Sequence, residues 1–132
     1  MPLIGCAMSI CEQVLARLRA SDAAWGKGDI QDFMAIFAPE VMTVSAAGIS
    51  RGRDSMALRI TQVYGNELRG TLVTTVESMQ MLTDDMVAVI GKFELRDSFT
   101  SVFSGCFSQV WMRDACGPRV VLDHVTYSSG EV

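Results

Sequence analysis

The first part of the chain carries its apolar residues at helical spacing. Ser9 and Glu12 have the form of a capping box, which predicts a helix that runs to about Trp25. The apolar residues on its inward face are Ile10, Val14, Leu18 and Trp25. Gly26 and Gly28 then interrupt the helical pattern.

A second helix is predicted to begin after Asp29, whose side chain is suited to capping. Its apolar stripe, at the i, i+3, i+4, i+7 spacing, is Ile30, Phe33, Met34 and Phe37. Pro39 prevents the helix from continuing, and the segment VMTVS predicts a strand that ends near Gly48. A third helix is predicted over residues 51–64.

In the second half the pattern changes to the alternation of apolar and polar residues that is typical of strands. Four strands are predicted, at about 71–82, 86–96, 102–113 and 118–128. Short turns join them, which favours consecutive antiparallel pairing. Three helices followed by such a meander predict a single α+β domain over residues 9–132, with the sheet curled over the helices. Residues 1–8 are predicted to be a tail.

The alternation also predicts which side chains face the helices. On the second of these strands they are Val87, Val89, Gly91, Phe93 and Leu95. On the third they are Phe107, Gln109 and Trp111, and on the last Val121, Asp123, Val125 and Tyr127. Two polar residues, Gln109 and Asp123, are therefore expected among apolar ones.

The amino-acid composition limits the functions that the chain can have. A chain of 132 residues with 49% apolar residues can bury a core without metal or disulfide support. The net charge of -4 and the scattered basic residues argue against a nucleic-acid or anionic-membrane partner, which would need clustered Lys or Arg. The four cysteines form no CxxC pair and His124 is the one histidine, so no metal site is expected. The N-terminal segment fits neither a secretory signal nor a membrane span, which predicts a cytoplasmic protein.

Several blocks together resemble the nuclear transport factor 2-like superfamily, in particular its polyketide-cyclase-like, ketosteroid-isomerase-like and kinase-association-domain branches. They are WGKGDIQDFMAIFAPEV, RGRDSM, SQVWMR and VVLDHVTYS, and the resemblance extends from Ile10 to Ser128. The Trp that commonly opens the last strand is replaced by Pro118. The resemblance implies a cone-shaped, cystatin-like roll: three helices packed in a strongly bent antiparallel sheet around a pocket. It also implies a homodimer that forms through the outer face of the sheet.

The resemblance singles out one catalytic position. The positions that carry the base and the acidic donors in ketosteroid isomerases match Ser45, Ser21 and Gln109 here, so steroid isomerase chemistry is not expected. The acid on the last strand of small polyketide cyclases matches Asp123. His124, next to it, is expected on the opposite face of the strand, unless a bulge turns it inward to assist catalysis.

The residues leave two interpretations of Asp123 open. A carboxyl group that faces an apolar pocket has a raised pKa and can exchange a proton with a carbon acid, while Gln109 donates a hydrogen bond to the substrate oxygen. Alternatively, Asp123 hydrogen-bonds backbone amides or pairs with an arginine such as Arg51 or Arg53. A substrate pocket would be lined by Trp25, Phe33, Phe37, Phe93, Phe107, Trp111, Asp22 and Tyr64. The aromatic residues of this set fit an ordinary core as well.

We therefore predict a small cofactor-independent enzyme of secondary metabolism, an isomerase or lyase such as a cyclase or dehydratase. Its substrate would be a small hydrophobic, carbonyl-bearing molecule of polyketide or terpenoid type. The alternative is a non-catalytic ligand-binding or dimerisation module of the same fold. The two differ in whether a cavity that is open to solvent reaches Asp123.

Overall fold

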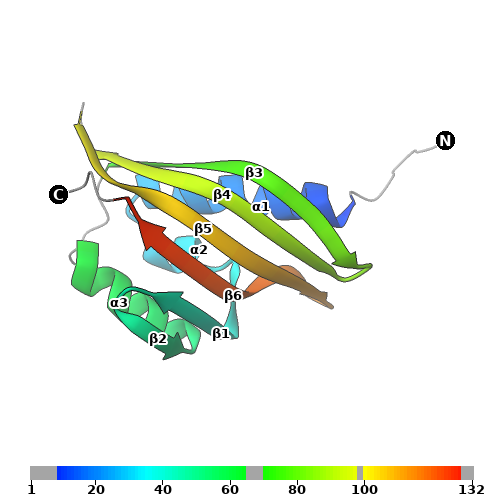
Figure 1. Ribbon diagram of the computed structural model, residues 1–132. Coiled ribbons are helices and arrows are strands. Elements are labelled where there is room, and N and C mark those ends of the chain that lie inside the picture. The colour runs from blue at the N-terminus through cyan, green and yellow to red at the C-terminus, as the bar shows by residue number, and fades with distance from the viewer. Residues whose placement is uncertain (1–8, 65–69, 98–99, 129–132) are drawn as a thin grey trace.

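The computed structural model describes residues 9–64, 70–97 and 100–128, and the predicted N-terminal tail lies outside these ranges. Within these ranges three helices and six strands follow one another (Figure 1). They are α1 (Ile10–Gly26), α2 (Ile30–Met34), β1 (Phe37–Ser45), β2 (Gly48–Arg51), α3 (Arg53–Tyr64), β3 (Thr71–Thr83), β4 (Met86–Asp97), β5 (Thr100–Asp114) and β6 (Gly117–Tyr127). Within the described ranges, no helix has the length and apolar character needed to cross a membrane.

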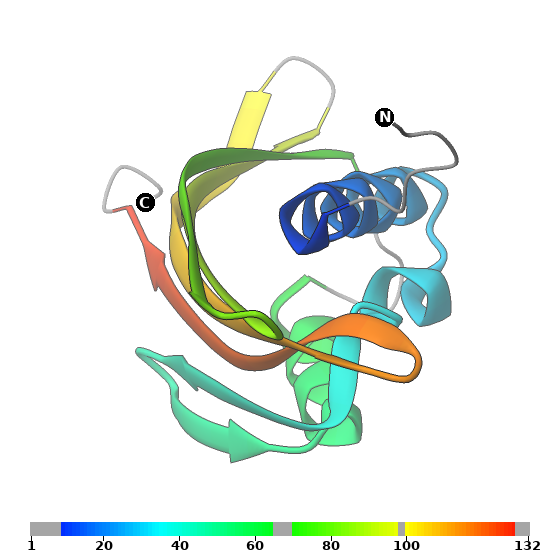
Figure 2. The ribbon, with the colours of Figure 1, turned by 90° about the vertical axis from the view of Figure 1, so that its right-hand side faces the viewer.

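The six strands form one sheet in the order β2-β1-β6-β5-β4-β3. Strands β3 to β6 make the predicted antiparallel meander. The sheet curls around the helices without closing, as Figure 2 shows, which confirms the α+β class and the bent sheet. One pairing differs from the expected all-antiparallel sheet, because β1 runs parallel to β6.

Helix α1 forms as the sequence predicts. Ser9 is its N-cap: the Ser9 hydroxyl accepts from the Glu12 backbone N–H at 3.1 Å, and Glu12 Oε1 accepts from the Ser9 N–H at 2.9 Å. This reciprocal capping satisfies two backbone donors that have no partner inside the helix. The predicted inward residues Ile10, Val14, Leu18 and Trp25 are all buried.

The second helix is shorter than predicted. Asp29 caps it as expected, but α2 ends at Met34, and Phe37 belongs to β1. The chain leaves the helix because its backbone pairs with β6, where the Val120 N–H donates to Ile36 O at 2.8 Å. Pro39 is tolerated inside β1 because the β1–β6 register shifts beyond Phe37, so its missing N–H breaks no ladder bond.

The third helix begins later than predicted, at Arg53, because residues 48–51 form β2. Strand β2 pairs with the end of β1 in a hairpin that the sequence analysis missed. Gly52 joins β2 to α3 with a φ of 97°, which is a conformation that favours glycine. The hairpin forms the lower edge of the sheet, beside α3 (Figures 1 and 2).

A bulge in β6 corrects one part of the predicted alternation. Val120 lies opposite Trp111 and Leu122 opposite Val110, so Val121 is the extra residue. Val120 is therefore fully buried in the place predicted for Val121. Because the bulge precedes residue 123, the remainder of β6 keeps the expected alternation.

Candidate functional site

An apolar cavity of about 140 Å³ lies between the helices and the concave face of the sheet. Five of the aromatic residues predicted to line a pocket do line it: Trp25, Phe33, Phe37, Phe93 and Phe107. Asp22, Gln109 and Asp123 supply polar groups. Tyr127 also lines it and is 41% exposed, which brings the rim of the cavity to the molecular surface.

Two predicted pocket residues are placed differently. Trp111 is not among the lining residues and is fully buried in the core. The prediction that Trp111 contacts the substrate is therefore wrong. Its indole N–H instead donates to Gln109 Oε1 at 2.9 Å and holds the Gln109 side chain in place. The side chain of Tyr64 lies outside the part of the chain that the structure describes.

Asp123 is 4% exposed and accepts a hydrogen bond at Oδ1 from Gln109 Nε2, at 3.2 Å. The indole N–H of Trp111 can only donate, so the Gln109 carbonyl must face Trp111 and its amino group must face Asp123. Residues 109 and 123 are also partners in the β5–β6 register, which places the two side chains on the same face of the sheet. Trp111 thus fixes the orientation of the amide that holds the carboxyl group.

The surroundings of Asp123 raise its pKa from the ordinary value of 3.8 to about 6. Removal of the carboxylate from water is the main cause, and the hydrogen bond from Gln109 partly opposes it. Oδ2 has no hydrogen-bond partner among the described residues and is not one of their fully buried unpartnered atoms. This oxygen is therefore reachable from the cavity.

The alternative partners proposed for Asp123 lie elsewhere. Arg53 donates to the Phe37 carbonyl at 3.2 Å, and Arg51 is exposed on β2. Within the described ranges, Gln109 is the one group that hydrogen-bonds the Asp123 side chain. The carboxyl group is therefore not neutralised by an arginine.

His124 lies outside the site. It is exposed on the outer face of β6, where its register partners are Ser108 on β5 and Val44 on β1. The bulge that could have turned it inward lies earlier in the strand. The predicted catalytic contribution of His124 is not supported by this placement, since its ring and the Asp123 carboxyl group lie on opposite faces of the sheet.

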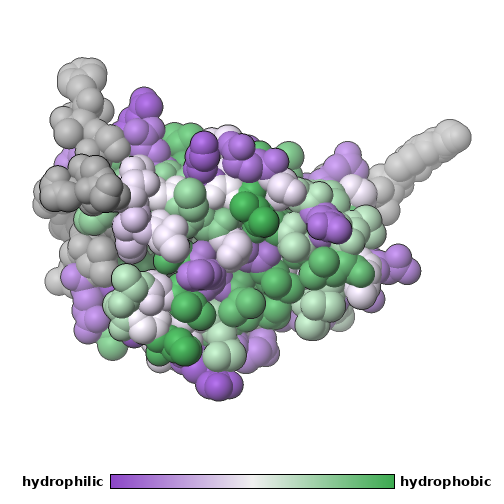
Figure 3. Space-filling view, viewed as in Figure 1, coloured by the Kyte–Doolittle hydropathy of each residue, from purple (hydrophilic) through white to green (hydrophobic). Residues whose placement is uncertain are grey.

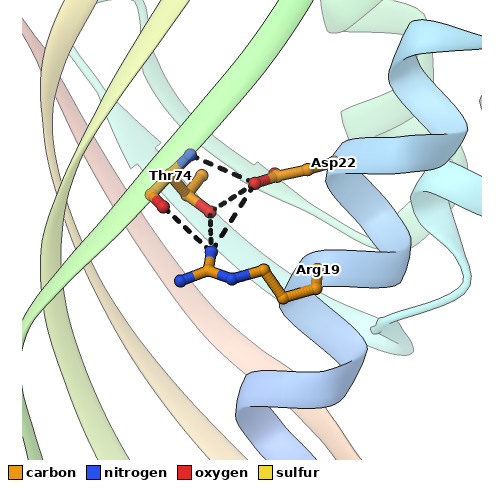
Figure 4. A network of polar contacts seen from close by, with 3 residues as sticks. All are labelled: Arg19, Asp22 and Thr74. Carbon is orange, nitrogen blue, oxygen red and sulfur yellow. Dashed lines mark hydrogen bonds and ion pairs between the residues drawn. The ribbon is translucent and has the colours of Figure 1, made fainter.

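Asp22 lines the cavity from α1 and is held by Thr74 on β3 (Figure 4). Its Oδ2 accepts from the Thr74 N–H at 3.1 Å and from the Thr74 hydroxyl at 2.7 Å. Arg19 Nη1 lies 3.9 Å from the same oxygen and donates to the Thr74 carbonyl at 2.9 Å. Desolvation raises the pKa of Asp22, although the Thr74 hydrogen bonds and the Arg19 charge oppose it. These contacts connect α1 to β3, which is a structural role.

A second cavity, of about 250 Å³, adjoins the first near Asp123. The two share Met56, Ile60, Asp123, Val125 and Tyr127. The second cavity adds polar side chains from β1 and α3, namely Thr43, Ser45 and Arg59. Sequence reasoning missed Arg59. The one available signal was its position three residues after the buried Met56, on the inward side of α3.

The described residues contain no group of three or more His, Cys, Asp or Glu side chains placed to hold a metal ion. The side chains that line the two cavities are the groups available for chemistry. They combine a protonatable carboxyl group, an amide and apolar walls, a set suited to proton exchange with a small apolar ligand or to binding it.

Comparison with solved structures identifies the fold. A nuclear transport factor 2-like protein from Shewanella oneidensis, of unknown function, superimposes with a TM-score of 0.77 over 88% of this chain and 98% of its own, at 19% identity. A putative calcium/calmodulin-dependent protein kinase type II association domain from Thiobacillus denitrificans gives 0.71 over 87% and 94%, at 24% identity. A ketosteroid isomerase-like protein from Erwinia carotovora gives 0.69 over 88% and 94%, at 13%. Neither a protein-family model nor a curated protein matches the sequence. The chain therefore has the fold of the nuclear transport factor 2-like proteins, as the resemblance of its sequence implied.

Proposed function

We propose that the protein is a cofactor-independent enzyme that moves a proton on a small, hydrophobic, carbonyl-bearing substrate. The observation that carries this proposal is the Asp123 carboxyl group, fixed by Gln109 at one oxygen and open to an apolar cavity at the other. The pKa of about 6 supports it, because a group that titrates near neutral pH both accepts and returns a proton readily. The ketosteroid isomerase-like neighbour shares the fold, which hosts enzymes and binding modules alike.

In the proposed step, Asp123 Oδ2 takes the proton from a carbon next to the substrate carbonyl. The electron pair of the broken C–H bond moves into the carbonyl group and forms an enolate. In an isomerisation the proton then leaves Oδ2 for another carbon of the enolate system. In a ring closure the enolate carbon bonds to a second carbonyl carbon, and the proton goes to the alkoxide oxygen that forms there. In a dehydration the enolate expels a hydroxyl group, which leaves as water with the proton. Gln109 has a second amino hydrogen besides the one given to Asp123, which can be donated to the enolate oxygen.

The cavities limit the size of the substrate. An apolar cavity of ~150 Å³ accommodates a molecule such as benzene, so the first cavity, at about 140 Å³, has room for about one ring. Together with the second cavity of about 250 Å³, the space enters the range of ~300–1,000 Å³ that ligand pockets usually occupy. A monocyclic or short-chain polyketide or terpenoid fits this space.

Deuterium exchange tests the proposal without knowledge of the final product. In D₂O, the protein should accelerate the replacement of hydrogen by deuterium beside the carbonyl of small cyclic ketones, followed by NMR. Asp123→Asn should lower the exchange rate by about 100-fold or more, the contribution typical of a general base. Asp114→Asn, which changes an exposed carboxylate, is the matched control and should exchange at the wild-type rate. Equal exchange in wild type and Asp123→Asn would contradict the proposal.

A second candidate is a binding or assembly module, and the outer face of the sheet favours association. Figure 3 shows apolar side chains gathered on this face of the molecule. Ile90, Met112 and Leu122 are exposed there, and the pairings Ala88 with Val110 and Val110 with Leu122 make the patch continuous across β4, β5 and β6. We propose that this outer patch forms a homodimer, since covering it removes apolar surface from water. The enzyme and the dimer are compatible, because the cavities lie on the other face.

A further inference from the structure

Arg59 carries a polar group that the folded chain leaves unused. Its Nη1 atom is buried and has no hydrogen-bond partner among the residues that the structure describes. No described residue forms an ion pair with it within the ranges that the structure covers. Its other guanidinium nitrogens, Nε and Nη2, have no hydrogen-bond partner among the described residues and are not among their fully buried unpartnered atoms, so a ligand can reach them.

Comparison with Arg119 separates Arg59 from an ordinary structural arginine. Arg119 also has a buried unpartnered nitrogen, Nε, but its Nη2 donates to Asp114 at 2.7 Å, and Arg119 lines neither cavity. Arg59 has no such carboxylate among the described residues, and its side chain lines the second cavity. Arg59 therefore carries unused donors, Nε and Nη2, on a side chain that lines a cavity, while its Nη1 atom is covered by protein.

The other polar groups at this end of the cavity can also donate. Ser45 Oγ accepts from the Ala47 N–H at 3.2 Å, which leaves the Ser45 O–H free to donate. The Thr43 and Ser50 hydroxyls are hydrogen-bonded to each other, and when Ser50 is the donor the Thr43 O–H is left to donate into the second cavity. A guanidinium and hydroxyl donors together suit a ligand group that only accepts and carries negative charge.

Asp123 determines how a ligand would be oriented. It lines the same cavity and accepts hydrogen bonds when it is ionised, so an anionic group avoids its end and is attracted to Arg59. The neutral part of the ligand is then left beside Asp123 and the aromatic residues of the first cavity. One molecule can thus reach both residues.

We propose that the second cavity binds the carboxylate of a small keto acid through Arg59, with the carbonyl-bearing part of the same molecule directed to Asp123. This inference rests on the proposed function for the carbonyl-bearing part, whereas the carboxylate site stands on Arg59 alone. A planar carboxylate matches one guanidinium fork. A phosphate dianion has more acceptor oxygens and more charge than one guanidinium and two hydroxyl donors satisfy.

The test uses 4-fluorophenylacetate and its neutral amide, 4-fluorophenylacetamide, which have the same ring and nearly the same shape. Binding is followed by ¹⁹F NMR titration. Wild type should bind the acid more tightly than the amide, by about tenfold or more, because a hydrogen-bonded charge is gained. Arg59→Met, which keeps the apolar stem, should abolish this preference. Arg51→Met removes an exposed positive charge from nearby β2 and should keep it.

NMR of the wild-type protein tests the same carboxylate site without relying on a variant that has to fold. The Arg59 Nε–H resonance should shift when the acid is added and stay in place with the amide. Equal affinity for acid and amide, or an unmoved Arg59 resonance, overturns the proposal. Tighter binding of inorganic phosphate than of the acid overturns it as well, because the site would then be specific for phosphate.

The Asp123→Asn variant distinguishes failure of this inference from failure of the proposed function. It should bind the acid at least as tightly as wild type, because a negative charge leaves the shared cavity. If deuterium exchange survives in this variant while acid binding depends on Arg59, the catalytic proposal fails and the carboxylate site stands. If exchange is lost while acid and amide bind equally, the carboxylate site fails and the catalytic role stands.

Discussion

Replacing Asp123 by asparagine should stabilise the protein at neutral pH. The surroundings raise the Asp123 pKa from 3.8 to about 6, which corresponds to about 3 kcal/mol of folding free energy at 1.36 kcal/mol per pKa unit. Below pH 3.8 the carboxyl group is protonated in both the folded and unfolded chain, and there is no penalty. As the pH rises, the unfolded chain ionises first, so stability falls until the folded group ionises near pH 6.

Asparagine has nearly the same shape and no charge, so the variant avoids this loss. Its Oδ1 can still accept from Gln109 Nε2, which keeps the contact that holds residue 123. The free energy of unfolding of Asp123→Asn, minus that of wild type, should therefore increase by about 2 kcal/mol between about pH 4 and about pH 8. In thermal melts this corresponds to a change on the order of 8 °C.

Urea unfolding of both proteins at a series of pH values measures this difference directly. The contributions of the titratable groups that the two proteins share cancel when one free energy of unfolding is subtracted from the other. The control is Asp114→Asn, because Asp114 has a lowered pKa, mainly through its hydrogen bond from Arg119. A lowered carboxyl pKa adds stability at neutral pH that disappears in acid, so this variant should lose stability relative to wild type as the pH rises. A pH-independent difference between Asp123→Asn and wild type would refute the reasoning about the buried carboxyl group.

Three other changes have expected outcomes. Gln109→Met leaves the Trp111 indole without an acceptor and removes a hydrogen bond that lowers the Asp123 pKa. The variant should therefore lower the free energy of unfolding by about 2–3 kcal/mol, measured by urea unfolding. It should also raise the Asp123 pKa above about 6, measured by ¹³C NMR titration. Ser9→Ala removes the N-cap of α1 and should cost about 1 kcal/mol, while Ser9→Asn should restore most of it in the same unfolding assay. Leu122→Lys places a charge in the outer patch and should convert a dimer to a monomer in light scattering; a monomeric wild type at micromolar concentration contradicts the proposed homodimer.

The parts of the fold that were predicted from sequence are those that depend on neighbours along the chain. The capping box and the stripe of α1 are local, as is the alternation that placed Gln109 and Asp123 inward. The predicted end of the second helix was wrong, although Phe37 has the correct helical spacing. The Phe37 backbone instead pairs with a parallel strand that lies some eighty residues later in the sequence. The extra residue in β6 likewise depends on its pairing with β5 and has no local signal.

Arg59 was missed for the same physical reason. An arginine on a helix usually projects its charged end into water, and nothing in its immediate sequence contradicts that expectation. The second cavity exists because β1 and the hairpin with β2 bring Thr43 and Ser45 next to α3. Since the sequence analysis assigned residue 51 to the third helix and missed β2, it could not place a polar wall opposite Arg59.

Asp123 and Arg59 are both unfavourable for folding where they lie. The ionised carboxylate loses hydration that Gln109 alone does not replace, and an unpartnered buried N–H costs about 1–3 kcal/mol. A chain that needed only a stable core would gain by an apolar residue at either position. The two side chains line one shared cavity without pairing with each other, so one ligand can use both: it accepts from the reachable nitrogens of Arg59 and exchanges a proton with Asp123. Such a ligand should also raise the melting temperature of the folded chain, since it binds the folded state alone.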